Sequence, residues 1–572
     1  MTDAASALAA GLAGPALEPH LETRHFPCGA CLMREGDQAE GAFFITSGEV
    51  RVEVERPDLD TDGVVSYMQP GTVCGEFALL DDGPRSASAY AHTDVVARVL
   101  TAEALDDLCR DDPAVGLSVL RLLSQHAARK ARDYSKHLEE FVFAGERDPR
   151  TDALVSASQA AQRHFASWSE EAVGALLADA AAVIAEHAAE LADATVAETG
   201  IGSVADKTVK NRFASLDVAA WLEARPGPGV IAQEDNQGLV QVADPVGVVL
   251  GLIPMTNPVA TLVFKALICW KARNSLIASC HRDAGDVAGR TVDLLRGVLA
   301  RHGAPLDLVQ DVRPRTTRRM TAALMSHPDV ALILATGGAA MVRAAYSSGT
   351  PAIGVGAGNA PVWVCADADP VRAAQAVVDG KSFDHGIICG SENNLVVDRS
   401  IHERFVKALR AAGAAVLGGG DCDKLQQVAF DEHGRLRRTV LGQPARAIAE
   451  LANIAVPADT RLLVAEVPRQ ASRGPFGREK LAPMLSLFTV DGDEDGLGLC
   501  RVLLGNGGDG HTAIVHSTSP ARQAAFAQRM PASRILVNGP GAHGCIGLGN
   551  GLTPSLTLGC GTYGNNSTTD NV

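Results

Sequence analysis

Residues 382–394, SFDHGIICGSENN, place a single cysteine, Cys389, in a glycine-rich turn just before the strand-like run LVV. A thiolate is a strong nucleophile near neutral pH and can form a covalent adduct with an aldehyde. Glycines on both sides of the cysteine let the backbone approach a substrate closely. The alternative is a small cysteine buried in the core, which is the commoner case for an isolated cysteine. The remaining segments of the chain decide between the two interpretations.

Around this stretch, apolar runs of strand length alternate with helical patterns. The apolar runs are VVLGLIP (248–254), SLIASC (275–280), VALILAT (330–336), APVWV (360–364) and RILVN (534–538). Alanine-rich helical stretches precede them at 153–197. Continuous apolar strands between helices predict an α/β domain whose sheets are covered on both faces.

The sequence between residue 20 and about residue 110 consists of short strands punctuated by glycine. The run at 35–55 alternates apolar and polar residues and turns at Ser47-Gly48. A helical pattern follows from Thr101 to about Lys136. This pattern predicts a small β-barrel or jelly roll with flanking helices.

These textures predict the domain organisation of the chain. The expected parts are a flexible N-terminus (1–19), the barrel domain (20–140), a linker within EFVFAGERDPRTD (141–152) and the α/β domain (153–572).

Composition limits the class of protein. The chain has 572 residues, 46% apolar residues and a net charge of −16, which predict several domains and argue against general nucleic-acid binding. No apolar run is long enough to span a bilayer, and the N-terminal residues lack the features of a signal peptide. The 12 cysteines suit a reducing compartment, and Cys28 and Cys31 form a lone CxxC without a second pair. We therefore expect a cytoplasmic protein with no metal site and no membrane partner.

The segment GEFALLDDGPRSASA (75–89) has the chemistry of a phosphate and ribose site. Gly75 and Glu76 offer a backbone N–H and a carboxylate acceptor for a hydroxyl. Arg85 can hold a phosphate in a bidentate fashion. Ser86 and the amide of Ala87 suit an anion.

The same segment resembles the phosphate-binding cassette of cyclic-nucleotide-binding domains, and the resemblance covers about residues 20–136. It implies that Glu76 holds the ribose 2′-hydroxyl and that Arg85 pairs with the cyclic phosphate of cAMP or cGMP. The alternative is a barrel that keeps the fold but binds no ligand and serves as an interaction platform. A catalytic-looking region follows the barrel instead of a helix-turn-helix, so DNA binding is not expected.

From about Leu154 to the end, the chain resembles CoA-acylating aldehyde dehydrogenases, above all the aldehyde dehydrogenase half of bifunctional aldehyde-alcohol dehydrogenases. Seven segments carry the resemblance in order: 198–215, 245–267, 335–362, 382–392, 479–485, 510–517 and 555–567. The implied fold has a Rossmann-like cofactor domain and a catalytic domain. Family members form oligomers, so a homo-oligomer is expected.

The resemblance implies roles for three catalytic residues. Cys389 attacks the aldehyde, and the side-chain amide of Asn257 and the backbone N–H of Cys389 receive the oxyanion. His511 is a candidate proton carrier for an incoming thiol. The alternatives are a turn residue for Asn257 and a structural histidine for His511.

The resemblance also implies a site for NAD. The segment ATGG follows a strand and opens a helix, whose N-terminus can receive a pyrophosphate. Glu479 matches the glutamate that holds the nicotinamide ribose, although a Glu-Lys pair more often lies on the surface. The candidate cofactor residues are Thr336, Gly337, Gly338, Gly354, Gly356, Gly358 and Glu479.

Two departures from hydrolytic aldehyde dehydrogenases favour the acylating branch. PAIGVGAGN (351–359) lacks the carboxylate that activates water in the hydrolytic members, and SCHRDA (279–284) lacks their lysine for the adenosine ribose. The resulting hypothesis is NAD-dependent oxidation of a small aldehyde to acyl-CoA, with coenzyme A as acceptor and a cyclic nucleotide as regulator. The alternatives are a dehydrogenase that releases a free acid and a catalytically dead cyclic-nucleotide sensor.

Overall fold

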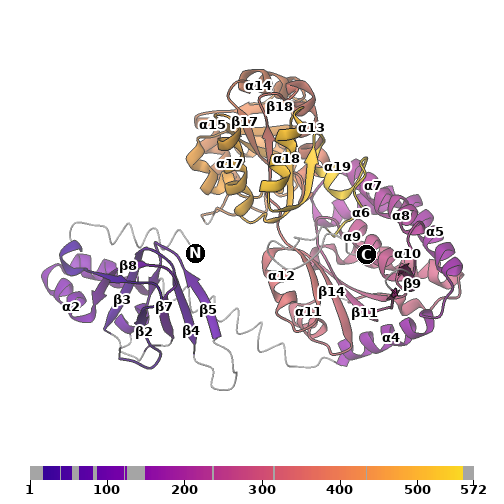
Figure 1. Cartoon of the computed structure of the whole chain (residues 1–572), viewed down its shortest axis with the longest axis horizontal. Coiled ribbons are helices and arrows are strands. Elements are labelled where there is room, and N and C mark those ends of the chain that lie inside the picture. The colour runs from indigo at the N-terminus through magenta and orange to yellow at the C-terminus, as the bar shows by residue number, and fades with distance from the viewer. Residues whose placement is uncertain are drawn as a thin grey trace. The chain divides into compact units, whose positions relative to one another are not determined.

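The computed structural model describes residues 17–38, 40–54, 63–80, 85, 87–121, 123–124, 149–234, 238–313, 316–432 and 434–557. The chain divides into two compact units, Met1–Phe141 and Val142–Val572 (Figure 1). Each unit has apolar cores of its own.

The first unit is a jelly roll, as expected. Its described strands form two antiparallel sheets, in the orders β1-β8-β3-β6 and β2-β7-β4-β5. Phe43, Val50 and Ala89 of the two sheets pack in one apolar core. The strands are β1 Glu22–Phe26, β2 Cys31–Met33, β3 Gly41–Ser47, β4 Val50–Val54, β5 Gly63–Met68, β6 Val73–Cys74, β7 Ser88–Ala91 and β8 Val95–Thr101. The helical segments include η1 Glu18–His20, η2 Glu76–Leu79 and α2 Ala102–Asp111, and residues 113–121 are also helical.

The structure adds detail at two of the expected boundaries. Leu17 is buried, and η1 Glu18–His20 follows it within the part expected as the N-terminus. At the linker, α4 begins at Pro149, because proline suits the first helical turn and Asp152 complements the positive helix N-terminus. Residues 149–152 are therefore helix, while 1–16 and 125–148 lie outside the described residues.

Helices open the second unit, in agreement with the alanine-rich pattern. They are α4 Pro149–Phe165, α5 Glu170–Glu186, α6 Ala188–Thr199, α7 Val204–Arg212, η4 Phe213–Asp217 and α8 Val218–Glu223. Ser169 and Ser203 cap α5 and α7 through their side chains, which accept backbone N–H bonds that would otherwise be unpaired.

The first parallel sheet of this unit has the order β13-β12-β11-β14-β15 among the described strands. Alternate residues of β11, the central strand, pack into separate apolar cores on the two faces of the sheet. Leu250 packs with Leu324 of α11 on one face, and Val249 packs with the core of α9 and α10 on the other. The elements are β11 Val248–Ile253, α9 Pro258–Lys271, β12 Ser275–Cys280, η5 Arg282–Ala284, α10 Gly285–Arg301, η6 Leu306–Leu308, β13 Val309–Asp311, α11 Arg318–Met325, β14 Val330–Thr336, α12 Ala339–Tyr346 and β15 Ala352–Val355.

The second parallel sheet has the order β18-β19-β20-β17-β16-β21-β22 among the described strands. Helices cover both of its faces (Figure 1). The elements are β16 Ala360–Val364, α13 Pro370–Ser382, η7 Phe383–Gly386, β17 Glu392–Asp398, α14 His402–Ala411, β18 Ala414–Leu417, α15 Gly420–Ala429, α16 Ala445–Leu451, β19 Leu462–Glu466, η8 Arg469–Arg473, η9 Pro475–Gly477, β20 Met484–Val490, α17 Asp493–Gly505, β21 Gly510–His516, α18 Pro520–Arg529, β22 Ala532–Val537 and α19 Gly541–Ile546.

The connection at 356–359 joins the two sheets, because it runs from β15 directly into β16. Asn257 and Thr336 lie at carboxyl ends of strands in the first sheet. Cys389 and His511 lie at amino ends of strands in the second sheet. The predicted catalytic and cofactor residues therefore gather where opposite edges of the two sheets meet.

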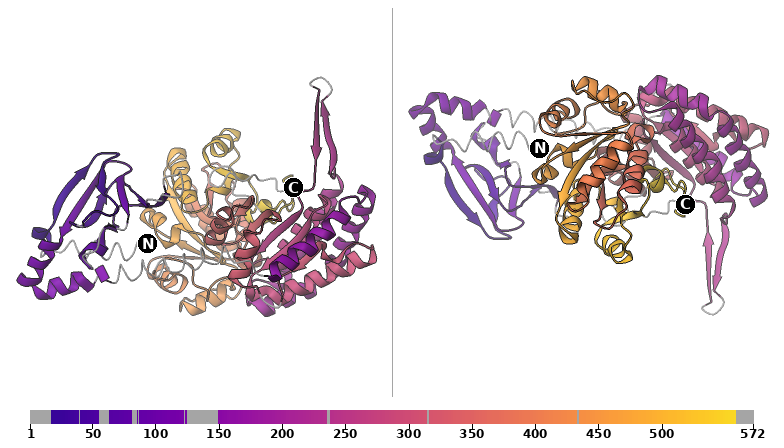
Figure 2. Two further views of the ribbon diagram at one scale, coloured as in Figure 1. Left: turned by 90° about the horizontal axis from the view of Figure 1, so that it is seen from below. Right: turned by 90° about the horizontal axis from the view of Figure 1, so that it is seen from above.

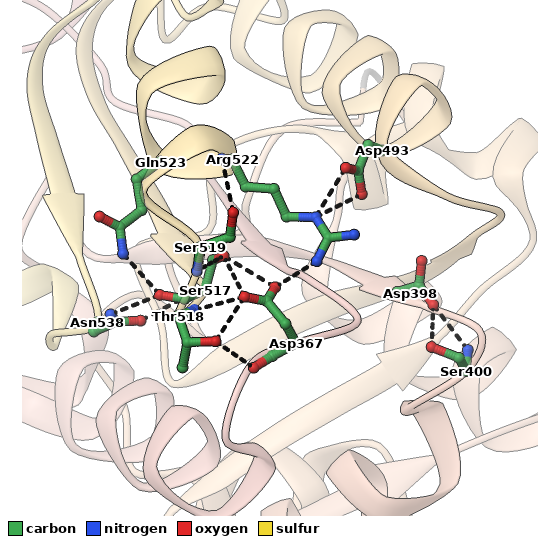
Figure 3. Close-up of polar contacts among 10 residues, drawn as sticks. All are labelled: Asp367, Asp398, Ser400, Asp493, Ser517, Thr518, Ser519, Arg522, Gln523 and Asn538. Carbon is green, nitrogen blue, oxygen red and sulfur yellow. Dashed lines mark hydrogen bonds and ion pairs between the residues drawn. The ribbon is translucent and has the colours of Figure 1, made fainter.

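The carboxyl edge of the second sheet is closed by a polar cluster (Figure 3). The Asp367 carboxylate follows β16 and accepts bonds from Ser517 Oγ, from the backbone N–H and hydroxyl of Thr518, and from Arg522. Arg522 also donates to Asp493, which begins α17. Burial alone would raise the pKa of Asp367, but these donors outweigh it and lower the pKa to about 2. The cluster ties β16, β21, α17 and α18 together.

A two-stranded hairpin projects from the second unit (Figure 2). Its antiparallel strands are β9 Gly229–Glu234 and β10 Leu239–Ala243. Val230, Leu239 and Val242 are exposed on it. Apolar hairpins are marginally stable alone and usually need a packing partner.

No single helix among the described residues is long and apolar enough to cross a membrane. The bent pair of α5 and α6 meets that test only when the two are taken together.

Candidate active site

The nucleophile loop runs from η7 to β17 and has an unusual backbone. Asp384, His385 and Gly386 have φ values of 47°, 52° and 71°, in the left-handed region. This conformation is costly for residues other than glycine and persists only where surrounding contacts hold it. The turn leaves Cys389 half-buried ahead of β17, which is an accessible position for a nucleophile.

Two glycines let this loop pack closely. A side-chain Cβ on Gly390 would lie 2.5 Å from Cys545 Sγ. A Cβ on Gly358 would lie 2.0 Å from the backbone oxygen of Cys389 and 3.4 Å from Cδ2 of His511. Non-bonded contacts of 2.0–2.5 Å are essentially never seen for a real Cβ atom. Gly358 therefore brings the inter-sheet connection directly against the nucleophile and beside His511.

Glu479 joins the same group of residues. Its carboxylate accepts the backbone N–H of Gly358 at 2.9 Å. Burial raises the pKa of Glu479 to about 7, against the effects of the Gly358 N–H and the nearby Lys381 and Lys480. Lys480 itself is fully buried, so the surface Glu-Lys pair considered from the sequence does not exist. Glu479 lies in the site.

A pocket of about 330 Å³ adjoins Glu479, a volume that suits a small ligand or part of a cofactor. Its lining residues are Gly434, Arg435, Leu436, Leu441, Arg478, Glu479, Leu481 and Asn506.

Asn257 stands at the N-cap of α9, but its side chain does not cap the helix. Its amide oxygen accepts instead from the ammonium of Lys210, and its Nδ2 lies 3.4 Å from Thr256 Oγ1. The side chain therefore contacts Lys210 and Thr256, in addition to its place in the turn before Pro258.

His511 is the second residue of β21, and its ring is buried. Nδ1 pairs with Thr512 Oγ1 at 2.9 Å, while Nε2 has no hydrogen-bond partner within the part of the chain that the structure describes. Burial, aided by the nearby Arg534, lowers the pKa of His511 to about 4. The imidazole is therefore neutral at pH 7, and the same burial makes it a weaker base than a solvent-exposed histidine.

Apart from Glu479, the candidate cofactor residues lie at or after the carboxyl ends of β14 and β15. Thr336 ends β14, and Gly338 is the N-cap of α12, as the sequence predicts. A Cβ on Gly338 would meet no atom within 4 Å, and one on Gly337 would meet only Met341. Gly354 differs, because a Cβ there would lie 2.6 Å from Val342, so this glycine packs against α12. Gly356 and Gly358 belong to the inter-sheet connection.

Sequence reasoning missed a buried lysine beneath Thr336. Lys265 of α9 donates to the Thr336 hydroxyl at 3.0 Å and to the backbone oxygens of Leu252 and Leu334. Burial lowers the pKa of Lys265 to about 7. It ties β11 to β14 at the edge where the candidate cofactor residues lie.

A second buried polar group supports the catalytic edge and was also missed. Lys381 donates to Ser391 Oγ, Asn393 Oδ1 and the backbone oxygen of Lys480, which joins the nucleophile loop to the Glu479 segment. Asn359 donates to two backbone oxygens and accepts from Asn394. Several of these residues lie inside the motif segments quoted above, which is the signal that the sequence offered.

In the first unit, the structure brings Gly75, Glu76 and Arg85 together. Arg85 is buried over the ring of Phe43 and donates to the backbone oxygens of Gly75 (3.0 Å) and Gly41 (2.7 Å). Gly75 has a φ of 76°, and a Cβ on it would lie 2.3 Å from Arg85 Nη1. Glycine is therefore required there to leave space for the guanidinium.

The other cassette residues are placed only in part. Glu76 is buried and begins η2, and Ala87 is half-buried just before β7. Ser86 lies outside the described residues.

Comparison with known proteins assigns both units. Residues 141–545 match the model of the aldehyde dehydrogenase family, and residues 23–112 match that of the cyclic nucleotide-binding domain. The bifunctional aldehyde-alcohol dehydrogenase AdhE of Escherichia coli K12 is 41% identical over 426 residues. That alignment covers 74% of this chain and 48% of AdhE, so the chain spans about half the length of this relative.

Solved structures agree with this assignment. An acetylating aldehyde dehydrogenase from Geobacillus thermoglucosidasius matches with a TM-score of 0.72 and 38% identity, covering 76% of this chain and 94% of that one. A Rhodopseudomonas palustris propionaldehyde dehydrogenase with bound CoA and an acylated cysteine matches with a TM-score of 0.68 and 29% identity, covering 73% and 94%. The chain belongs to the aldehyde dehydrogenase family and carries a cyclic nucleotide-binding domain ahead of its dehydrogenase region.

Proposed function

We propose that this protein oxidises a small aldehyde to an acyl-CoA with NAD as hydride acceptor, through a thioester on Cys389. The close approach of Gly358 to Cys389, beside the neutral imidazole of His511, carries this proposal. The connection at 356–359 contains no carboxylate that could activate water. A thioester formed there would survive until a thiol accepts the acyl group.

In the proposed reaction, the Cys389 thiolate attacks the aldehyde carbon. Asn257 Nδ2 and the backbone N–H of Cys389 donate to the developing oxyanion. NAD, when bound, would supply the acceptor for the aldehyde hydride, which would leave the acyl group as a thioester on the sulfur of Cys389. The thiol of coenzyme A then takes the acyl group and gives its proton to Nε2 of His511. The overall reaction is aldehyde + CoA + NAD⁺ ⇌ acyl-CoA + NADH + H⁺.

The cofactor would lie along the carboxyl ends of β14 and β15, with Glu479 at the nicotinamide ribose. Thr336 to Gly338 offer a strand end and an uncrowded helix start for the pyrophosphate. Gly354, Gly356 and Gly358 would keep the backbone close to it.

Product analysis tests the proposal. We expect NADH formation from acetaldehyde or another small aldehyde only when CoA is present, with acyl-CoA as the product. NADH without CoA, with release of the free acid, would establish the non-acylating alternative. Cyclic-nucleotide binding without turnover on any aldehyde would favour the sensor scaffold. Parallel assays with NADP would settle the preference for the cofactor.

The first unit is proposed to bind cAMP or cGMP and to regulate turnover. Support comes from the convergence of Gly75, Glu76 and the buried Arg85. Regulation requires that the nucleotide bind two conformations of the protein with different affinity.

Arg85→Ala should weaken cyclic-nucleotide binding by ten- to a hundredfold, the size expected for loss of charge-assisted bonds to a phosphate. Calorimetric titration of the full chain measures this. The matched control is Arg24→Ala, because Arg24 is a half-exposed arginine of β1 paired with Glu22. Unchanged affinity in the Arg85 variant would contradict the proposed site.

We also propose the division into a barrel domain (20–140), a linker and a dehydrogenase domain (from about 153), in a cytoplasmic homo-oligomer. The projecting hairpin, with Val230, Leu239 and Val242 exposed, supports the assembly of several chains.

A further inference from the structure

Two lysines of α7 reach into the nucleophile loop. Lys207 and Lys210 lie one helical turn apart and are both buried, at 3% and 1% exposure. Both ammonium groups contact Oδ2 of Asp384, which is itself fully buried. Buried charges are retained only where partners compensate their lost hydration, so this cluster is costly unless every contact is kept.

Each lysine has a second contact, and the two contacts differ. Lys207 donates to the backbone oxygen of Thr256 at 3.0 Å. Lys210 donates to the side-chain oxygen of Asn257. An ammonium group has only donors, so the amide must turn its oxygen toward Lys210. Nδ2 of Asn257 is then directed away from the lysine.

The side-chain amide of Asn257 is thereby oriented so that Nδ2 can donate a hydrogen bond. Asparagine at an N-cap usually accepts backbone N–H bonds through its oxygen, and Asn257 does not. Lys210 holds that oxygen instead. The remaining Nδ2 contact, to Thr256 Oγ1, is long at 3.4 Å and weak.

We propose that Lys210 is a positioning residue for the oxyanion site, acting through Asn257. This inference rests on the proposed function. By fixing the amide oxygen, Lys210 holds the Nδ2 donor toward the aldehyde oxygen before the reaction begins. Its positive charge also polarises the amide as negative charge develops on the substrate oxygen.

Asp384 connects this arrangement to the nucleophile. Its Oδ1 accepts the backbone N–H of Ser203 at 2.7 Å, and its own N–H donates to Asp206 Oδ2 at 2.9 Å. These bonds hold the left-handed backbone of Asp384 in the turn that leads to Cys389. Because Lys207 also contacts Asp384 Oδ2, this turn keeps a cationic partner when Lys210 is replaced.

Lys210→Met tests the inference, because methionine fills a similar volume without charge or donors. We expect kcat for CoA-dependent NADH formation to fall about a hundredfold, as for loss of an oxyanion donor, with little change in aldehyde KM. The matched control is Lys271→Met. Lys271 is also buried and ion-paired, with Glu170, but lies at the opposite end of α9 from Asn257.

A double-mutant cycle separates positioning from general damage. In an Asn257→Ala background, Lys210→Met should lower kcat by less than about threefold, because the amide through which it acts is gone. A full hundredfold further loss would show that Lys210 acts through the structure at large, and would overturn the inference. The rate of Cys389 alkylation by iodoacetamide should stay unchanged in Lys210→Met. A large change in the alkylation rate would also show that Lys210 acts through the structure at large, and would overturn the inference.

Two further outcomes are distinguishable. If the wild-type chain forms no CoA-dependent NADH, the proposed function fails and the inference falls with it. If the wild type is active and Lys210→Met keeps kcat within threefold, only the inference fails. Should Lys210→Met not fold, Lys210→Gln replaces it in the same cycle, because glutamine keeps a hydrogen-bond donor but carries no charge. Its effect should likewise vanish in the Asn257→Ala background.

Discussion

Replacing Cys389 with alanine is expected to abolish CoA-dependent NADH formation, lowering kcat by roughly four orders of magnitude or more. Cys389 is the one thiol between η7 and β17, so its loss removes the sulfur that would carry the acyl group. A methyl group at this position leaves the oxyanion donors and the cofactor site in place but removes the bond-forming atom. Steady-state NADH assays with the purified variant measure the effect. Mass spectrometry of the wild type after mixing with aldehyde and NAD should find the acyl group on Cys389.

The control for this experiment is Cys545→Ala. Cys545 is the thiol that Gly390 places against the nucleophile loop. Burial raises its pKa to about 12, so it remains protonated and unreactive near neutral pH. Its loss should leave turnover within about threefold, an allowance for the small cavity created in the core. Substantial turnover in the Cys389 variant would contradict the covalent route.

Gly358→Ala is expected to give a folded protein whose kcat/KM is lower by two to three orders of magnitude, roughly the cost of misplacing a reacting group. The new methyl group would fall 2.0 Å from the backbone oxygen of Cys389. Because that neighbour is backbone, either the nucleophile loop or the connection at 356–359 must shift. Movement of the loop changes the position of Cys389 relative to His511. Movement of the connection disturbs the bond from the Gly358 N–H to Glu479. Kinetics, combined with circular dichroism to confirm folding, measure this result.

The matched control is Gly297→Ala. Gly297 lies on the exposed face of α10, where a Cβ would meet no atom within 4 Å. Alanine there should leave turnover unchanged and raise stability by about 0.5–1 kcal/mol through helix propensity. Normal turnover in the Gly358 variant would show that the connection and the nucleophile loop are not in close contact.

The fold was largely predictable because its signals are local. The runs at 248–254 and 330–336 form the central strands β11 and β14, since continuous apolar segments are stable only where helices cover both faces. The turns at Gly48 and Gly75 likewise have the left-handed backbone that glycine permits. Segment ends, such as the start of α4 at Pro149, are less precisely located by such patterns.

The site was less predictable because its supporting contacts are not local. Lys210 and Asp384 are separated by 174 residues, and nothing in a helix rich in polar residues shows that two of its lysines are buried. The surroundings of Glu479 likewise depend on residues that are distant in the sequence. A Glu-Lys pair usually lies in water, and only the packing of Gly358 and Lys381 around it reverses that expectation. The sequence identifies groups that react, whereas their supports emerge from packing.

The Asp367 cluster lies away from the reacting groups, so that stability and activity depend on different edges of the same sheet. It secures the carboxyl edge of the second sheet, while the nucleophile and His511 occupy the amino edge of the same strands. Mutations in the cluster therefore change the free energy of unfolding without contacting the reacting groups. A lineage under thermal pressure could adapt at one edge and a lineage facing a new aldehyde at the other. Neither change would oblige a compensating change in the other.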